Sequence, residues 1–259
     1  MTPYMTANRQ KVALVTGGAK RIGRAIALAL AERGWDVAIH YGQSGNDAAE
    51  SVRAIEALGR RAVALQCDLA DEAAVKELLP RAAAALGPVQ CIVNNASLFD
   101  YDDAASFDYA RLDAHMHANL GAPVLLARCL HDATPAGGQS VVVNLLDQKL
   151  YNLNPDFLSY TLSKASLHAA TTVLAQALAP KLRVVGVAPG ISLVSGEQTE
   201  DGFAKAHQLT PLGKSSTPDD IAAAVCFVAE APAITGTTLV VDGGQHLIPL
   251  QRDVMFIAK

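Results

Sequence analysis

The chain has 259 residues, of which 51% are hydrophobic and 18% are charged, and its formal net charge is −4. This length suits a single α/β domain, and the apolar share allows a full core. The sequence has no basic block, which argues against nucleic acid as the main partner, and no apolar run long enough to cross a bilayer. We therefore expect a cytoplasmic protein that acts on a small molecule and has no membrane partner.

The four cysteines are spread along the chain at Cys67, Cys91, Cys129 and Cys226. No Cys-x-x-Cys pair occurs, so the spacing does not indicate a metal centre or a redox motif. Free cysteine is among the most frequently buried residue types. We therefore expect buried free thiols and no bound metal.

Short apolar runs alternate along the chain with longer segments that have helical periodicity and capping residues at their ends. The apolar runs predict strands at residues 12–16, 36–41, 61–68, 91–95, 140–146, 182–190 and 237–244. The longer segments predict helices at residues 21–32, 46–58, 71–86, 108–131, 159–178 and 218–229. Asp71 is the expected N-cap of the third helix because its side chain can accept from free backbone N–H groups.

This alternation implies right-handed crossovers and one parallel sheet covered on both faces. The sequence therefore predicts an α/β fold, a single Rossmann-like domain over residues 1–259 with a doubly wound, parallel, seven-stranded sheet. Residues 191–210 show no clear strand and have mixed polarity, so we expect a mobile flap there. Only the ends, at about residues 1–9 and 250–259, are expected to be loose.

The stretch TGGAKRIG places Gly17, Gly18 and Gly23 between the first predicted strand and the first predicted helix. A glycine turn at this point lets phosphate groups approach backbone N–H groups at the positive end of a helix. A plain tight turn is the alternative. The position after the first strand of a βαβ unit favours dinucleotide binding.

Charges near this turn favour NADP over NAD. Folds that bind NAD usually carry an acid at the tip of the second strand, about 20 residues beyond the glycines. The tip here reads HYGQS, and Asp36 lies at the opposite end of that strand. Lys20 and Arg21 lie in the glycine turn itself, where a guanidinium can form paired bonds to a phosphate. Two solvated surface cations are the alternative.

Tyr160 and Lys164 are separated by one helical turn and therefore lie on one face of a predicted helix. A phenol ionises near pH ~10, and a nearby cation favours the phenolate, so we expect Lys164 to lower the pKa of Tyr160. Tyr160 would then exchange a proton near neutral pH. Asn119, inside the long predicted helix, could bend that helix around a bound water and relay protons, although a structural asparagine is the alternative.

Asp147 follows the fifth predicted strand and stands thirteen residues before Tyr160. An ionised carboxylate cannot donate a hydrogen bond, and it would repel the alkoxide that forms in carbonyl reduction. It suits a substrate whose ring nitrogens need a proton or whose N–H groups need an acceptor. A strand-end acid that faces water is the alternative.

Several separate motifs occur in one order along the chain: TGGAKRIG, Asp68 after the third strand, NNAS after the fourth, Asn119, YTLSK, and APG after the sixth. Together they resemble the short-chain dehydrogenase/reductase family over about residues 11–246. Two departures from its commonest pattern are Arg21 in place of a third glycine and Asp147 in place of a serine. In both departures the sequence resembles the pteridine reductases and the related dihydromonapterin reductases. The stretches HYGQS, NASLF and DGGQHL also resemble those enzymes.

The resemblance implies a role for each matched position. It implies a catalytic set of Asn119, Asp147, Tyr160 and Lys164, and a flat substrate ring stacked on Phe99. Substrate contacts are implied for Ser97, Phe99, Asp147 and Tyr160. Contacts to NADPH are implied for Gly17, Lys20, Arg21, Ile22, Tyr41, Ser44, Asp68, Leu69, Asn95, Ala96, Ser97, Lys164, Pro189, Gly190 and Ser192.

The expected function is NADPH-dependent reduction of a pterin C=N bond, from dihydropterin to tetrahydropterin. A homotetramer is implied by the resemblance, and the helices at 108–131 and 159–178 have few charges on their outer faces, as buried interfaces do. Two alternatives stay open. One is an NADPH-dependent carbonyl reductase that acts on a 3-oxoacyl thioester or another ketone, and the other is a non-catalytic sensor that binds NADP.

Overall fold

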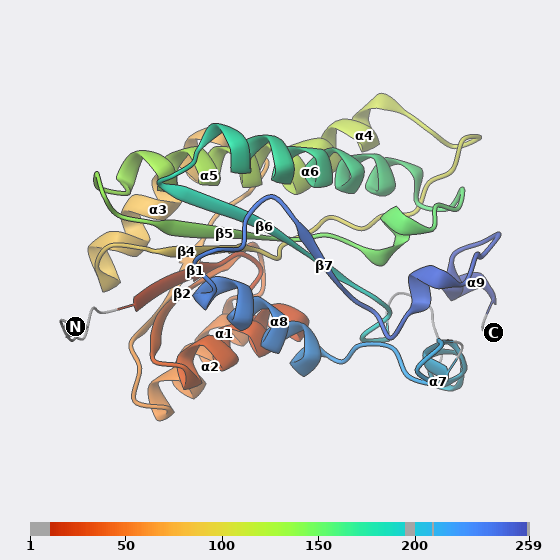
Figure 1. Ribbon diagram of the computed structural model, residues 1–259, viewed down its shortest axis with the longest axis horizontal. Helices are drawn as coiled ribbons and strands as arrows, with labels where there is room; N and C mark the ends of the chain where they lie inside the picture. Colours follow the sequence, from red (N-terminus) through yellow and green to blue (C-terminus); the bar gives the residue numbers. More distant parts are fainter. Residues whose placement is uncertain (1–10, 195–199, 209, 258–259) are drawn as a thin grey trace.

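The computed structural model describes residues 11–194, 200–208 and 210–257. Its centre is a single sheet with the strand order β3-β2-β1-β4-β5-β6-β7 (Figure 1). Every neighbouring pair of strands is parallel, so the predicted fold is confirmed. The strands are β1 (Lys11–Val15), β2 (Trp35–Tyr41), β3 (Ala62–Gln66), β4 (Cys91–Asn94), β5 (Ser140–Leu145), β6 (Leu182–Pro189) and β7 (Thr238–Val241).

Helices cover both faces of this sheet (Figure 1). One face carries α1 (Arg21–Glu32), α2 (Gly45–Ala57) and α8 (Pro218–Glu230). The other face carries α3 (Glu72–Leu86), α4 (Tyr109–Met116), α5 (Ala122–Ala133) and α6 (Leu158–Ala177). Two short helices, α7 (Glu200–Gln208) and α9 (Val254–Ile257), lie beside each other at one end of the molecule.

Two apolar cores, one on each face of the sheet, hold the helices in place. Ile26 and Leu30 of α1 pack with Val225 of α8 in the first core. Leu78 of α3 packs with Leu126 of α5 in the second. These side chains are fully buried, and burial of one side chain of this size contributes about 1.5–3 kcal/mol. Because the central strands are covered on both faces, they are continuous apolar runs rather than alternating ones.

The strand order changes direction at β1. From β1 the chain proceeds to β2 and β3 on one side, whereas β4 to β7 lie on the other. A reversal of this kind leaves a crevice at the carboxyl ends of the strands, where ligands of open α/β sheets bind. The glycine turn follows β1 and residues 95–97 follow β4, so both predicted site segments border this crevice.

The long helix predicted at 108–131 is interrupted. α4 passes into a π-helical turn, η1 (His117–Gly121), and the chain continues as α5. Asn119 is the central residue of η1. Single π turns inside helices are frequent at functional sites. The helix is thus irregular at Asn119, where a bend was considered, and the irregularity is this π-helical turn.

Two segments are more regular than the sequence predicted. Within the expected flap, residues 200–208 form α7, while residues 195–199 and 209 lie outside the described part of the chain. At the carboxyl end, residues 254–257 form α9, and Asp253 bonds to a buried carboxylate. The expectation of a loose tail is therefore wrong for residues 250–257, because the contacts that hold it come from distant positions. Among the described residues, no helix combines the length and hydropathy needed to span a membrane.

Candidate active site

A cavity of about 240 Å³ lies beyond the carboxyl ends of β4, β5 and β6. It brings together residues from seven separate parts of the chain. The predicted site residues that line it are Arg21, Ile22, Asn95, Ser97, Phe99, Asp147, Tyr160, Lys164, Pro189, Gly190 and Ser192. Three residues that the sequence did not indicate, Asp253, Val254 and Met255, also line it.

Tyr160, in the first turn of α6, donates a hydrogen bond to Oδ2 of Asp147 over 2.7 Å. Burial raises the pKa of Asp147, although the N–H of Lys149 and the Tyr160 hydroxyl, which both donate to it, act in the opposite direction. Burial and the neighbouring Asp147 raise the pKa of Tyr160 well above its usual value. The expected lowering of this pKa is therefore wrong for the chain without ligands. Tyr160 is therefore a protonated phenol that donates its hydrogen bond to Asp147.

Lys164 lies one helical turn after Tyr160 and is 3% exposed. Its Nζ donates to the backbone oxygen of Leu145 over 2.8 Å and lies 5.8 Å from the centre of the Tyr160 ring. Burial lowers the pKa of Lys164 to about 8, against the opposing effect of Asp147. The acid therefore contacts the phenol hydroxyl directly, whereas the ammonium bonds to the end of β5.

Asn119 does not line this cavity but joins two of its walls. Its amide nitrogen donates to the Leu98 oxygen and to Oγ of Ser163, both over 3.0 Å. Its amide oxygen accepts from the Leu98 N–H over 2.8 Å. Ser163, which the sequence did not single out, donates in turn to the backbone oxygen of Tyr160. The segment after β4 is thus fixed relative to the helix that carries Tyr160.

Phe99 presents an aromatic surface to the cavity. One side of its ring stacks on Phe157, with 4.2 Å between ring centres, and Tyr160 meets it edge-on at 4.6 Å. Phe99 is still 38% exposed. Stacking of this kind holds a flat ring in a defined plane, so the exposed part of Phe99 is suited to a planar ligand.

A second cavity, of about 350 Å³, surrounds the glycine turn and contains no acid among its lining residues. The predicted residues that line it are Gly17, Lys20, Arg21, Ile22, Tyr41, Ser44, Asn95, Ala96 and Ser97. The first turn of α1 contains no acid, and its N-cap Lys20 forms no side-chain capping bond. The positive end of α1 can therefore bind an anion. Arg21 and Asn95 line both cavities, so the two are adjacent.

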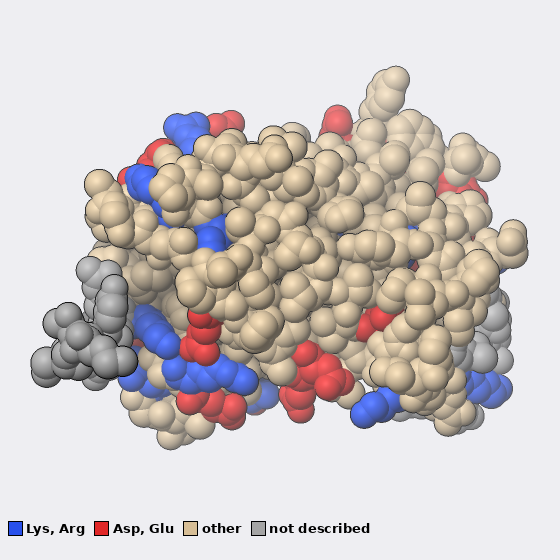
Figure 2. Space-filling model, viewed as in Figure 1, with Lys and Arg blue, Asp and Glu red and all other residues tan. Residues whose placement is uncertain are grey.

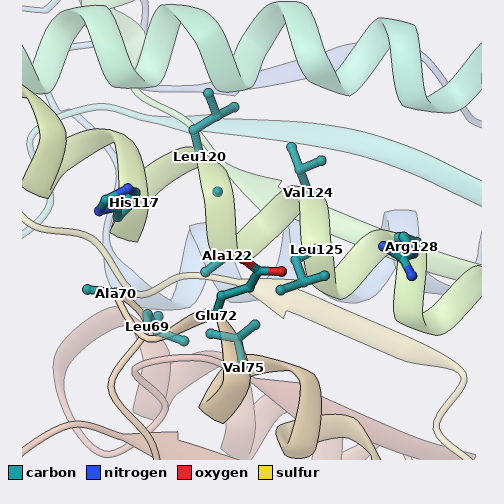
Figure 3. A pocket seen from close by; sticks show the side chains of 11 residues that line it. Leu69, Ala70, Glu72, Val75, His117, Leu120, Ala122, Val124, Leu125 and Arg128 are labelled. Atoms are coloured by element: carbon teal, nitrogen blue, oxygen red, sulfur yellow. The ribbon is translucent and has the colours of Figure 1, made fainter.

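Besides Asn119, two predicted residues line neither of these cavities. Asp68 accepts from the N–H of Ala70 and closes a turn after β3. Leu69 lines a different cavity, of about 600 Å³, between α3 and α5. Figure 3 shows Leu120, Val124 and Leu125 on one side of that cavity and Val75 on the other. The predicted contacts of Asp68 and Leu69 with NADPH stay predictions, because neither residue lines the cavity at the glycine turn.

Comparison with known proteins agrees with the layout of the site. Residues 17–246 match the family model described as Enoyl-(Acyl carrier protein) reductase. The chain belongs to the short-chain dehydrogenase/reductase family. A similar curated member is the 3-oxoacyl-[acyl-carrier-protein] reductase FabG of Staphylococcus epidermidis, which is 31% identical over 92% of this chain and 99% of its own length.

Two solved structures of the short-chain dehydrogenase/reductase family are also similar. FolM alternative dihydrofolate reductase 1 of Brucella canis, complexed with NADP, is 40% identical, with a TM-score of 0.90, and the match covers 97% of this chain and 99% of that chain. A short chain dehydrogenase of Burkholderia cenocepacia, in complex with NADP, is 34% identical, with a TM-score of 0.82 and coverage of 91% and 97%.

One departure from the common short-chain dehydrogenase/reductase pattern has a structural cost. Arg21 replaces a glycine and keeps a left-handed backbone, with φ of 54°. This conformation costs a residue with a side chain about 1–2 kcal/mol. The guanidinium donates to the Val194 oxygen over 3.1 Å, at the start of the predicted flap. Strain of this kind is retained where a residue has a function.

His40 supports the glycine turn of this short-chain dehydrogenase/reductase, and the sequence did not single it out. Its Nδ1 accepts from the Gly17 N–H over 3.1 Å, and its Nε2 bonds to the Cys67 oxygen over 3.0 Å. The ring must therefore be neutral, with its proton on Nε2. Burial lowers the pKa of His40, which favours that state. The sequence feature that could have indicated this role of His40 is a polar residue inside an otherwise apolar strand. Over the described ranges, no cluster of three metal-ligating side chains occurs.

Proposed function

We propose that this protein is an NADPH-dependent reductase of a pterin. It would reduce the C=N bond of a dihydropterin and so form a tetrahydropterin. The observation that carries the proposal is the hydrogen bond from Tyr160 to Asp147. A carboxylate beside the proton donor disfavours an alkoxide product and favours ring nitrogens that take a proton. The Brucella canis relative, named an alternative dihydrofolate reductase, supports the same substrate class.

The cavity at the glycine turn suits NADP. It offers two cations, the free N-terminus of α1 and no acid, which matches the charge of a phosphorylated dinucleotide. Lys20 and Arg21 would hold its phosphates, and Asn95 and Lys164 lie where the cavity continues toward Tyr160. When bound, NADPH supplies the hydride for the reduction. Relatives crystallised with NADP support this cofactor.

The chain's own residues orient the substrate and deliver the proton. Phe99 would hold the ring flat, so that stacking fixes its orientation toward the reacting atoms. Tyr160 would donate its phenolic proton to the ring nitrogen as the carbon takes the hydride, which balances the reduction of C=N to CH–NH. Asp147, whose pKa is raised by burial, would stabilise the phenol before the step and assist its reprotonation. Asn119 would position the Leu98 segment and, through Ser163, Tyr160.

A carbonyl reductase is the second candidate. The FabG relative, named a 3-oxoacyl-[acyl-carrier-protein] reductase, favours a substrate such as a 3-oxoacyl thioester. The position usually held by a serine, which donates to a developing alkoxide, is here the acceptor Asp147. This second reaction is therefore expected to be slow.

The decisive experiment measures NADPH oxidation with dihydrobiopterin beside a panel of ketones that includes an acetoacetyl thioester. Turnover of the pterin with little turnover of the ketones supports the proposal. Fast reduction of a ketone and none of the pterin would favour the second candidate. NADPH binding without turnover of any compound would favour a non-catalytic sensor.

We also propose a homotetramer. The only Asp, Glu, Lys or Arg in α6 is Lys164, which is buried, whereas Leu162 and Val173 of this helix are 44% and 61% exposed. Figure 2 shows a broad area without charged side chains over α6 and β7. Packing against further copies would bury such a face. Light scattering at micromolar concentration should report four chains, and a Val173→Glu change should reduce the assembled mass. A monomeric parent protein would contradict the proposal.

A further inference from the structure

The last described residues of the chain form one side of the catalytic cavity. We call residues 252–256 the C-terminal arm. Asp253, Val254 and Met255 of this arm line the same cavity as Asp147 and Tyr160. The arm includes most of α9, which lies beside α7 at the end of the molecule where the C-terminus is marked (Figure 1). The arm is thus part of the site rather than a loose extension.

A buried carboxylate holds the start of the arm. The Nε of Arg252 donates to both carboxylate oxygens of Asp156, over 3.0 and 2.8 Å. The Nη2 of Arg252 lies 2.8 Å from Oδ1 of the same carboxylate. The backbone N–H of Asp253 donates to the same carboxylate over 2.7 Å. The side chain of Asp156 is 3% exposed. Paired guanidinium–carboxylate bonds fix geometry as well as adding energy, so Asp253 has a defined place.

Lys149 connects the arm to the catalytic acid. Its backbone N–H donates to Oδ1 of Asp147 over 2.8 Å, and its Nζ lies 3.3 Å from Oδ2 of Asp253. Nζ also donates to the backbone oxygen of Asp156, and the Lys149 side chain is 3% exposed. One buried residue therefore contacts the carboxylates of both Asp147 and Asp253.

Aromatic contacts join the arm to the proposed stacking residue. The ring of Phe256 lies 6.1 Å from that of Phe157, which in turn stacks on Phe99. Phe157 keeps a left-handed backbone, with φ of 55°. Such strain persists only where the surroundings hold it. The arm therefore supports the far side of the same aromatic group that would orient a flat ligand.

Asp253 keeps hydrogen-bonding capacity toward the cavity. Oδ1 accepts from the Met255 N–H over 3.1 Å, and Oδ2 faces Lys149. A carboxylate oxygen can accept two hydrogen bonds, so each oxygen can accept one more. The Asp253 side chain is 15% exposed, and the residue lines the cavity. A molecule bound in the cavity could therefore donate N–H hydrogen bonds to the carboxylate of Asp253.

We propose that Asp253 is a second substrate-binding carboxylate, and that the C-terminal arm selects a flat heterocycle whose edge carries an amino group beside a ring N–H. This inference rests on the proposed pterin reduction and adds the residue that recognises the ring edge. A ketone has no such donors, and an anionic group would be repelled by two nearby acids. Asp147 serves the proton step, whereas Asp253 serves recognition.

The test compares Asp253→Asn with the parent on two compounds, dihydrobiopterin and its analogue that lacks the ring amino group. A hydrogen bond to a charged group is worth roughly ten- to a hundred-fold in affinity. We expect Asp253→Asn to raise the KM for dihydrobiopterin by about that factor, with kcat little changed, and to leave the KM for the analogue nearly unchanged. Such non-additivity identifies a direct contact. The dissociation constant for NADPH should stay the same, because Asp253 is not among the residues that line the glycine-turn cavity.

Asp113→Asn, an equivalent change at an exposed position of α4, is the matched control and should alter neither KM. Arg252→Gln removes the bonds to Asp156 without changing a residue that lines the cavity, and it should raise the KM for both compounds. Equal effects of Asp253→Asn on the two compounds, or none, would overturn the assignment while leaving pterin reduction intact. A parent enzyme that neither binds nor reduces dihydrobiopterin would overturn the proposed function and this inference together.

Discussion

The hydroxyl of Tyr160 donates to Oδ2 of Asp147 over 2.7 Å, so the phenolic proton points at an acid before any substrate enters. A base at this place holds the phenol in its protonated form, because ionisation would put two negative charges side by side. A substrate nitrogen that takes this proton forms no oxyanion on the substrate, and the phenolate left on Tyr160 must then be reprotonated, a step that Asp147 can assist. This relationship gives the acid a function that a serine could not perform.

Substitution of the two partners should separate their roles. Tyr160→Phe removes the proton donor and should lower kcat for dihydrobiopterin by about 10²–10⁴-fold, the usual contribution of a general acid. Asp147→Ser should lower pterin turnover, leave NADPH binding nearly unchanged and allow a trace of ketone reduction. Steady-state kinetics with both substrate classes and fluorescence titration with NADPH measure these effects. If Asp147→Ser reduces dihydropterin as fast as the parent, Asp147 has no part in the reaction.

Lys164 should set the alkaline limit of activity. Its pKa is lowered to about 8, so the ammonium is present below that pH and is lost above it. We expect kcat/KM, which reports on the free enzyme, to fall above pH about 8. Lys164→Arg should move the fall to higher pH, because a guanidinium keeps its charge. The unfolded chain keeps this proton up to its usual pKa of 10.5, so the stability cost of burying Lys164 is relieved as the pH rises from about 8 to 10.5. A profile that is the same in both proteins would exclude Lys164 as the titrating group.

Arg21→Gly should weaken cofactor binding without lowering the stability of the protein. A glycine adopts the φ of 54° without strain, so the unfolding temperature without ligands should stay the same or rise. NADPH affinity should fall by roughly ten- to a hundred-fold through loss of a charge-assisted contact, and NADH affinity should fall less. Thermal unfolding and titration with both cofactors test this. An equal loss for NADPH and NADH would show that Arg21 does not distinguish them.

His40 should make the glycine turn sensitive to acid. Burial lowers its pKa below the usual 6.5, and only the neutral ring accepts from Gly17. Below pH 6.5 the unfolded chain therefore binds a proton that the folded chain excludes. The contribution of His40 to the free energy of unfolding is fully present above pH 6.5 and is lost as the pH falls below it. His40→Asn cannot take up that proton and should flatten the dependence between pH 5 and 7. Unfolding midpoints across this range measure the slope. An unchanged slope would place the acid sensitivity elsewhere.

The sequence by itself determined the sheet and the positions of most site residues. The apolar run 141–143 is buried in β5. Helix boundaries carry local signals, such as Asp71, which accepts from the N–H groups of Ala73 and Ala74 as predicted. Parallel strands then bring their carboxyl ends to one edge. The spacing of Tyr160 and Lys164 on one helix also fixes their common face, because it follows from helical geometry alone.

Only the tertiary structure decided which groups interact across the site. The phenol of Tyr160 meets Asp147 rather than the ammonium of Lys164, and this reverses the expected direction of its pKa shift. The sequence predicted a loose end at residues 250–259, yet Arg252 is paired with Asp156 in the fold. Burial and charge proximity depend on distances between residues far apart in the chain, and a local pattern contains no record of those distances.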